Sequence, residues 1–335
     1  MFRFVSSKNP VKLKKAYLAQ YNVNLLQKKL DKLMTDYPNI KAALSDDITV
    51  KKLLVGNFKY LAKVYSAYTS YLNGKTPEES LLIRSAFVKG GFNYDSHKSK
   101  IANFLMNMNN GFDIHNCVYC DLEDVRTFTK ADGSDVRKFE TEHVLDKGVC
   151  PLVALSLYNF VPSCGTCNGP GIKGMKTIGD TEGEIAKLSP SAEGYDFDGK
   201  VKFEVKVVTP GATDLNTTTH ADDYEIDFNI IENIYQKSID LFELKQRYNN
   251  KREKMELLKW RDKRRSNPNN IVQQFADIKK VTFDEMFEEM FELNLRRREH
   301  YPMEKARREV RHCPRFCVNR KLEDSSFILE SCFQI

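Results

Sequence analysis

Apolar side chains recur at helical spacing through the first third of the chain. The two clearest runs are Leu25, Leu26, Leu30 and Leu33, and then Leu54, Phe58, Leu61 and Tyr65. Side chains three and four residues apart lie on one face of an α-helix, so each run predicts a helix with one buried face. Thr76, Pro77 and Glu79 have the order of an N-cap, a first helical position and a capping-box glutamate. We therefore expect a helical region over residues 1–110.

The hydrophobic pattern changes to a period of two near residue 200. Phe203, Val205 and Val207 alternate with charged residues. Successive side chains of a strand point to opposite faces, so this segment predicts a short strand with one buried face. Asp198 and Gly199 precede it and are typical of a hairpin turn.

Helical spacing returns from about residue 228 and continues to about residue 265. Thr282 to Glu285 then repeats the capping-box pattern and predicts the start of another helix. The patterns together predict an α+β chain of three regions. A helical region covers residues 1–110, a loop-rich core with a short β-hairpin covers residues 111–210, and a second helical region covers residues 211–335.

Composition narrows the class of protein. The chain has 335 residues, of which 41% are hydrophobic and 29% are charged, which is ordinary for a folded globular protein. It has no apolar run of about 18–20 residues, the length that a membrane helix needs. The first 15 residues lack the apolar segment of a secretory signal. We therefore expect a cytoplasmic protein with no membrane contact.

The net charge of +6 hides a segregation of charge along the chain. Residues 1–110 hold 18 Lys and Arg against 7 Asp and Glu, whereas residues 111–240 hold 12 against 23. Basic surface attracts the phosphates of nucleic acids, so the basic flanks are the better candidates for binding a polyanion. The alternative is that these charged residues only form the solvent-exposed faces of helices.

Four of the eight cysteines form two Cys-x-x-Cys pairs. They are Cys117 and Cys120, and then Cys164 and Cys167. In the cytoplasm such pairs indicate metal rather than disulfides, and two pairs supply the four thiolates of a closed structural zinc site. A further group, His312, Cys313 and Cys317, has no second pair nearby, and we interpret it as structural or incidental.

Between and just after these pairs lie residues that could carry chemistry. Residues 139–146 are typical of a short strand, with Glu142 and His143 near its end. Asn159 precedes the second pair, and Asn168 follows its last cysteine directly. A neutral imidazole is a natural general base near pH 7, and carboxylate and amide oxygens suit a hard divalent ion.

This order of residues resembles the HNH endonuclease family, in its zinc-containing form with two Cys-x-x-Cys pairs around the active site. The match runs from Cys117 to Lys176 and is an H-N-N variant, because its third position is Asn168 rather than histidine. The resemblance implies a small ββα-metal core, embedded here between helical regions, and hydrolysis of phosphodiester bonds in single- or double-stranded DNA.

The roles follow from the resemblance and from the chemistry together. His143 would be the general base and Asn159 would orient it by bonding nearby backbone. Mg²⁺ or Mn²⁺ would be held by Glu142, or alternatively Asp146, and by Asn168, and would stabilise the departing oxygen. Lys173 and Lys176 would contact flanking phosphates.

A weaker resemblance extends beyond this core. The stretch from Ser189 to Phe203 and the helices after residue 228 are similar to the HNH components of Septu-like antiphage systems and of retron-associated nucleases. That likeness implies a partner ATPase that gates the nuclease and a role in antiviral defence. The helical flanks could also serve homo-oligomerisation.

Two alternatives remain open from the sequence. The chain could be a zinc-stapled nucleic-acid-binding or partner-docking module without catalysis, or an RNA nuclease with the same core. Contacts to phosphates carry little information about the type of strand, so the motif does not separate DNA from RNA.

Overall fold

The computed structural model describes residues 10–44, 47–110, 112, 114–208 and 220–291, together with the backbone of the strand Ser326–Ile328. The chain divides into two compact units. We call residues 2–114 and 125–195 the N-terminal unit, and residues 115–124 and 196–335, with Met1, the C-terminal unit. This division cuts across the three regions expected from the sequence. The mixture of helices with small antiparallel sheets confirms the α+β class.

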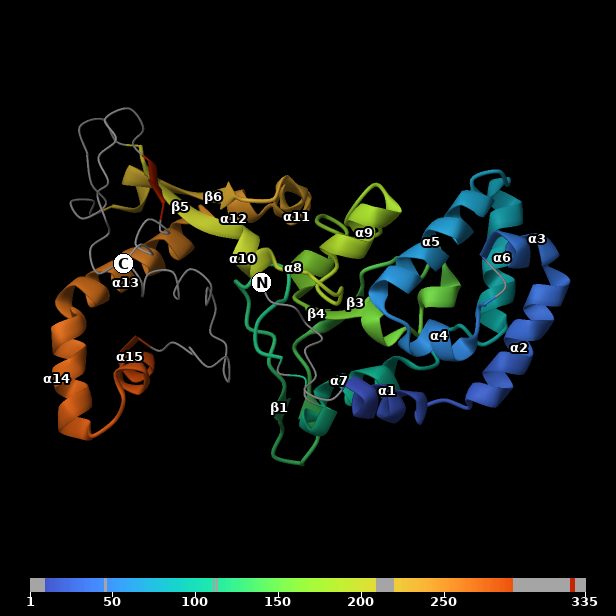
Figure 1. Cartoon of the computed structure of the whole chain (residues 1–335), viewed down its shortest axis with the longest axis horizontal. Helices are drawn as coiled ribbons and strands as arrows, with labels where there is room; N and C mark the ends of the chain where they lie inside the picture. Colours follow the sequence, from blue (N-terminus) through green and yellow to red (C-terminus); the bar gives the residue numbers. More distant parts are fainter. Residues whose placement is uncertain are drawn as a thin grey trace. The chain divides into compact units, whose positions relative to one another are not determined.

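The N-terminal unit begins with helices, as the apolar spacing predicts (Figure 1). These are α1 (Pro10–Leu18), α2 (Val23–Asp36), α3 (Pro38–Leu44), α4 (Val50–Val55), α5 (Phe58–Leu72), α6 (Pro77–Lys89), α7 (Lys98–Met106) and the 3-10 turn η1 (Met108–Asn110). The capping box at Thr76 is confirmed, because its hydroxyl accepts from the Glu79 amide at 3.2 Å while the Glu79 carboxylate accepts from the Thr76 amide at 2.9 Å.

The second apolar run is divided between two helices rather than lying on one. Leu54 belongs to α4, whereas Phe58, Leu61 and Tyr65 belong to α5. The chain leaves the helical conformation at Gly56, and the side chain of Asn57 then caps α5 by accepting from the Tyr60 amide at 2.9 Å. The expectation of one helix here is wrong because apolar spacing continues across a break that the cap creates.

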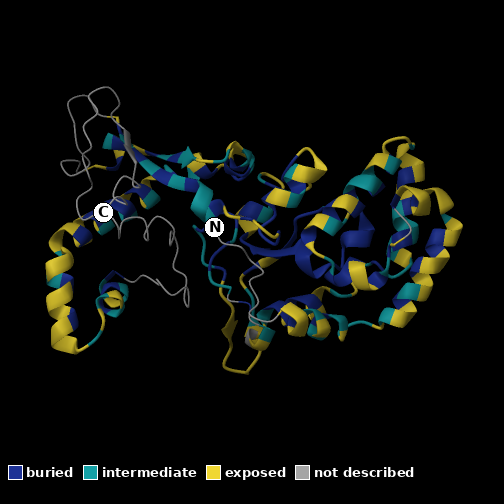
Figure 2. Ribbon diagram, viewed as in Figure 1, coloured by how far each residue is buried: buried dark blue, intermediate teal, exposed yellow. Residues whose placement is uncertain are grey.

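The rest of the N-terminal unit is built from short elements. They are β1 (Phe128–Thr129), β2 (Asp135–Val136), β3 (Glu140–His143), η2 (Pro151–Val153), η3 (Leu157–Asn159), β4 (Phe160–Ser163), α8 (Gly165–Asn168) and α9 (Glu182–Leu188). β3 and β4 form an antiparallel pair in which Glu140 lies opposite Ser163 and His143 opposite Phe160. Nearly all of this hairpin is buried, as the dark colour of its strands shows (Figure 2), and α5 packs against η2 and α9.

The C-terminal unit contains a larger sheet and further helices. The elements are α10 (Phe197–Lys200), β5 (Val201–Val207), η4 (Ala221–Asp223), β6 (Tyr224–Ile230), η5 (Asn233–Tyr235), α11 (Gln236–Leu241), α12 (Leu244–Tyr248), α13 (Lys251–Ser266), α14 (Asn269–Lys279), α15 (Phe283–Phe291) and β7 (Ser326–Ile328). The strand order is β6-β5-β7, and both pairings are antiparallel.

The expected strand at 201–207 is confirmed, because Phe203, Val205 and Val207 are buried and the residues between them are partly exposed. The hairpin turn expected at Asp198 and Gly199 is wrong. Both residues lie in α10, where the Asp196 carboxylate accepts from the Gly199 amide at 3.0 Å and holds one helical turn.

The sequence expectation for residues 228–265 also needs correction. Residues up to Ile230 belong to β6, which pairs with β5 along its whole length, and the helical part after it is split into α11, α12 and α13. β6 has an alternating pattern of its own, but the apolar residues that follow it at helical spacing obscure the boundary. The sequence therefore predicts the type of each segment, helix or strand, more accurately than its first and last residues.

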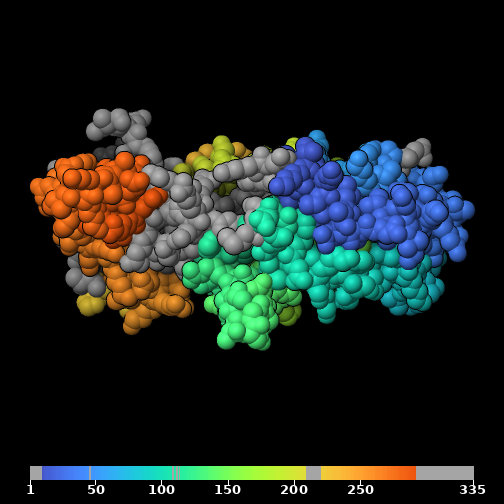
Figure 3. All heavy atoms as spheres, turned by 90° about the horizontal axis from the view of Figure 1, so that it is seen from below, coloured from blue at the N-terminus to red at the C-terminus, as the bar shows by residue number. Residues whose placement is uncertain are grey.

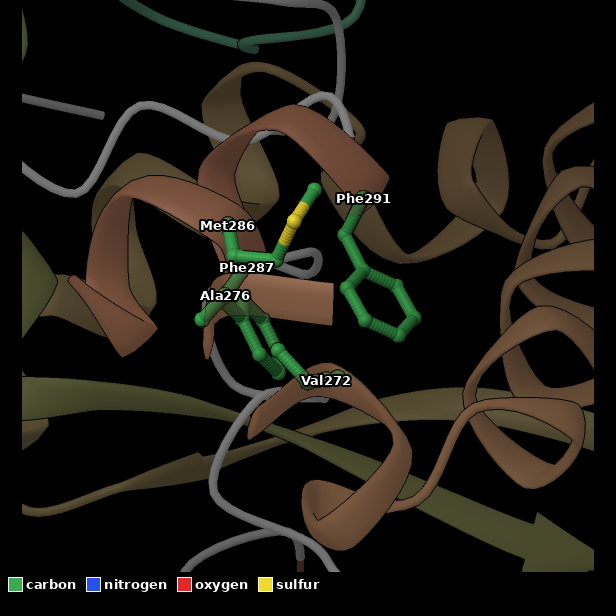
Figure 4. Close-up of a cluster of buried hydrophobic side chains, with 5 residues drawn as sticks. All are labelled: Val272, Ala276, Met286, Phe287 and Phe291. Carbon is green, nitrogen blue, oxygen red and sulfur yellow. The ribbon is translucent and has the colours of Figure 1, made fainter. Parts of the chain in front are cut away.

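The end of the C-terminal unit has its own apolar core. Val272 and Ala276 of α14 pack with Met286, Phe287 and Phe291 of α15, and all five are buried (Figure 4). Thr282 forms the predicted capping box with Glu285 at the start of α15. Among the residues that the structure describes, none of the helices combines the length and apolar character needed to cross a membrane.

Candidate functional site

The two Cys-x-x-Cys pairs come together in the structure. The sulfur atoms of Cys117, Cys120, Cys164 and Cys167 lie within 4.8 Å of one another, and all four residues are buried. Four clustered thiols can hold a zinc-like metal ion, since zinc takes four thiolates in a tetrahedron with bonds of about 2.3 Å. The cysteine cluster predicted from the spacing is therefore confirmed as a possible metal site.

Each pair is shaped by hydrogen bonds within its own knuckle. The Cys167 amide donates to the Cys164 sulfur at 3.3 Å, and Cys164 caps the short helix α8. In the first pair, the Cys117 amide donates to the Glu123 carbonyl at 2.9 Å, and the Asp121 amide donates to the Cys117 carbonyl at the same distance. Asp121 has a φ of 58°, the left-handed conformation that closes a tight knuckle.

Helix α12 supports the first pair within the C-terminal unit. Arg247 donates to the Cys120 sulfur at 3.4 Å and forms an ion pair with Glu123 at 3.1 Å. The Tyr248 hydroxyl donates to the Cys120 carbonyl at 2.8 Å. A guanidinium beside a sulfur favours the thiolate, which is the form that binds metal.

Cys150 does not belong to the cysteine cluster. Cys150 is fully buried and lies apart from the cluster, and its burial raises the pKa of its thiol to about 12. It is therefore a neutral thiol at pH 7. The group of His312, Cys313 and Cys317 lies outside the residues that the structure describes.

His143 ends strand β3 and is packed on several sides. Only 5% of its surface is exposed. Its ring lies 4.5 Å from that of Tyr94 and 5.0 Å from that of Phe160, measured between centroids and with steep interplanar angles. Its Nε2 atom lies 3.1 Å from the Ala154 carbonyl.

These contacts define the state of the imidazole. Burial, with a smaller effect of Lys147, lowers the pKa of His143 to about 3, so the ring is neutral at pH 7. A carbonyl oxygen can only accept, so the single ring proton lies on Nε2 and is donated to Ala154. Nδ1 then carries the lone pair, and this atom is the one that could take a proton.

Asn159 forms hydrogen bonds with two backbone segments close to His143. It is completely buried, and its Oδ1 atom accepts from the Leu145 amide at 2.7 Å. Its Nδ2 group donates to the Leu145 carbonyl at 2.9 Å and to the Val153 carbonyl at 3.0 Å. One side chain thus connects the loop after β3 to the segment whose next carbonyl, that of Ala154, accepts from His143.

Glu142 and Lys173 form a buried ion pair. The Lys173 ammonium lies 2.5 Å from the Glu142 carboxylate and donates to the His143 carbonyl at 3.1 Å. Lys173 is only 1% exposed, so it is not available for the phosphate contact predicted from the sequence. That expectation failed because nothing local in the sequence shows that this lysine turns inward. Lys176, three residues later, is exposed.

Gly174 lets the chain turn directly after Lys173. Its φ is 47°, a left-handed conformation that residues with a side chain rarely adopt. A Cβ atom at this position would lie 3.0 Å from the Pro170 backbone. The inward direction of Lys173 therefore depends on the glycine that follows it.

The carboxylates expected to hold a catalytic metal ion are unequally placed. Glu142 is occupied by the Lys173 ammonium, so the ligand set predicted from the resemblance does not fit a divalent ion in this arrangement. Asp146 accepts from the Gly148 amide through Oδ1 at 2.6 Å, and its Oδ2 atom is buried with no hydrogen-bond partner among the described residues. Asn168 is half-buried at the end of α8, in a helix that contacts β3.

Sequence reasoning missed Tyr94, the closest aromatic neighbour of His143. It lies in the loop before α7, far from either cysteine pair, and the Lys147 ammonium lies 5.0 Å above its ring. A single tyrosine in a loop has no motif that could have indicated this contact. The Ala154 carbonyl was missed for a similar reason, because backbone acceptors leave no signal in a sequence.

Asn159 provides a first test of this geometry. Asn159→Ala is expected to reduce the free energy of unfolding by about 2–4 kcal/mol, because it leaves buried backbone groups without partners. Chemical denaturation monitored by circular dichroism measures this loss. Asn168→Ala is the matched control, with an expected change below about 1 kcal/mol since Asn168 is half-buried at a helix end. Equal losses in the two variants would contradict the bridging role of Asn159.

Comparison with known proteins gives no family for this chain. No protein-family model, no curated protein and no solved structure matches it.

Proposed function

We propose that the chain is a nuclease of the HNH type that hydrolyses phosphodiester bonds in DNA. The observation that carries the proposal is the environment of His143. Its Nε2 proton is directed to a backbone carbonyl, which leaves the lone pair on Nδ1, and it ends the first strand of a β-hairpin whose second strand leads into a short helix. This order of two strands and a helix supports the proposal, because the resemblance implies a ββα core.

The residues of the chain would divide the work as follows. His143 takes a proton from the attacking water at Nδ1. The Ala154 carbonyl fixes the ring through Nε2, and Asn159 holds the segment that carries this carbonyl. The Tyr94 ring packs edge-on against the imidazole, with the two ring centroids 4.5 Å apart.

Mg²⁺ or Mn²⁺ is the cofactor that the resemblance implies, but the residues present do not form the expected ligand set, because Glu142 is paired with Lys173. Glu142 becomes a ligand only if Lys173 withdraws from it. The four-cysteine cluster, by contrast, would hold a structural zinc ion.

His143→Ala tests the catalytic proposal. Purified wild-type and variant proteins are incubated with supercoiled plasmid, single-stranded DNA and RNA, each with Mg²⁺, with Mn²⁺ and with EDTA. We expect cleavage of DNA that falls by about 100-fold or more in His143→Ala, since a general base contributes on the order of 10²–10⁴ in rate. His220→Ala, at an exposed histidine of the C-terminal unit, should retain wild-type activity.

The same experiment separates the alternatives. Cleavage confined to RNA would replace DNA as the substrate. A folded, zinc-loaded wild-type protein that cuts nothing would favour a binding module, or a nuclease that a partner ATPase keeps inactive. Free cutting of plasmid without any partner would contradict obligate gating of this kind.

A further inference from the structure

A group of aromatic and basic side chains continues from His143 across the N-terminal unit. We call Tyr21, Tyr94, His97, Lys100 and Lys147 the aromatic–basic surface. All five are half-buried or exposed. The proposed function uses none of them in catalysis.

Two tyrosine–lysine pairs form the ends of this surface. Lys147 lies 5.0 Å above the ring of Tyr94, which itself contacts the ring of His143. Lys100 lies 6.0 Å above the ring of Tyr21 and donates to the Gln20 carbonyl at 2.8 Å. Each pair places a positive charge beside an aromatic face, with one pair directly next to the candidate base.

His97 connects the two pairs. Its ring lies 5.2 Å from that of Tyr21, and its amide donates to the Tyr94 carbonyl at 2.8 Å within one turn of the chain. Figure 3 shows the blue surface of the first helices adjoining the teal surface near residue 100, so these segments share one face. Residues 1–110, which carry four of the five side chains, hold 18 Lys and Arg against 7 Asp and Glu.

We propose that the aromatic–basic surface binds a single strand of nucleic acid and leads it to His143. Unpaired bases stack on Tyr94 and Tyr21, while Lys147 and Lys100 leave the rings and bind the phosphates. Alternating aromatic and basic groups are the feature by which proteins hold unpaired strands, because every base has a face that can stack. A duplex keeps its bases stacked on one another, so it cannot use the rings. This inference rests on the proposed nuclease function and specifies its substrate.

The chain contains a matched control for this surface. Lys75 lies 5.4 Å above the ring of Tyr71 at the end of α5, and both residues are half-buried. The pair has the same chemistry as Tyr94 and Lys147, but its ring contacts do not include His143. Substitutions there report the effect of losing any tyrosine or lysine from this unit.

The test is fluorescence anisotropy of dye-labelled oligothymidylate and oligouridylate, and of a duplex of equal length, with the full chain and no added Mg²⁺. We expect either single strand to bind more tightly than the duplex. Tyr94→Ala should raise the dissociation constant for a single strand about tenfold, while Tyr94→Phe and Tyr71→Ala stay within about twofold of wild type. Lys147→Ala and Lys100→Ala should each lower the slope of log Kd against log salt by about 0.7.

Two results would overturn the inference. One is tighter binding of the duplex than of both single strands. The other is an equal effect of Tyr94→Ala and Tyr71→Ala in proteins with matched melting temperatures. Failure of this inference is distinguishable from failure of the nuclease proposal: loss of binding in Tyr94→Ala would support the surface even if the wild-type protein cuts no substrate. Cleavage that is lost in His143→Ala but unchanged in Tyr94→Ala would support the nuclease and contradict the surface.

Discussion

Replacement of Lys173 by methionine is expected to lower the free energy of unfolding by about 3–5 kcal/mol at pH 7.5. The substitution preserves most of the side-chain volume but removes the ammonium that lies 2.5 Å from Glu142. It leaves a carboxylate that is only 4% exposed without its counter-charge. Urea denaturation of the two proteins measures the difference.

Lys176→Met is the control, because it removes an equal charge from an exposed position in the same loop. Its expected change is within about 0.5 kcal/mol. A double variant, Lys173→Met with Glu142→Gln, should recover a large part of the loss, since no buried charge then remains. Similar losses for Lys173→Met and Lys176→Met would contradict the ion pair.

The effect of Lys173→Met should also depend on pH. Burial raises the pKa of Glu142 above its ordinary value, while Lys173 opposes this shift. Without Lys173 the folded-state pKa of Glu142 rises further, so protonation of the carboxyl group stabilises the folded variant as pH falls. The difference between variant and wild type is therefore expected to be larger at pH 8 than at pH 5.

Loss of one cluster cysteine is expected to have the other large effect. Purified chain should carry one zinc ion, and Cys120→Ser or Cys164→Ser should reduce this stoichiometry strongly, because each removes one thiolate of four. Structural zinc sites in small domains contribute apparent free energies of about 10–16 kcal/mol. We therefore expect the melting temperature to fall well beyond the range of an ordinary core substitution.

Plasma mass spectrometry gives the zinc content, and differential scanning fluorimetry gives the melting temperature. Cys150→Ser is the control, because Cys150 is equally buried but lies outside the cluster. It should keep one zinc ion even if packing suffers. Equal zinc content in the Cys120, Cys150 and Cys164 variants would exclude the cluster as the metal site.

The sequence indicated the class of most segments but not where they end. Helical spacing and the boxes at Thr76 and Thr282 identified helices correctly, because caps and apolar faces are local properties. The break before α5 and the strand β6 were missed, because each depends on an interaction with another part of the chain. Asn57 caps the start of α5, and β6 forms only by pairing with β5. Pairing between segments distant along the chain leaves little trace in either one.

The candidate site was also predictable from the sequence only in part. The cysteine cluster was predictable because ligand spacing is itself local, and Asn159 does form hydrogen bonds with backbone close to His143. The inward turn of Lys173 and the contact of Tyr94 with His143 were not predictable. Both depend on the path of a loop, and a lysine or tyrosine in a loop is by default a solvated side chain.

The turn at Gly174 means that substitutions at three positions are expected to depend on one another during evolution. An ion pair between Glu142 and Lys173 requires that the backbone reverse at Gly174, where only a residue without a side chain is unstrained. Chains descended from the same ancestor should therefore retain or lose the acid, the lysine and the glycine together. Such joint variation would identify distant relatives of this chain where overall similarity has faded.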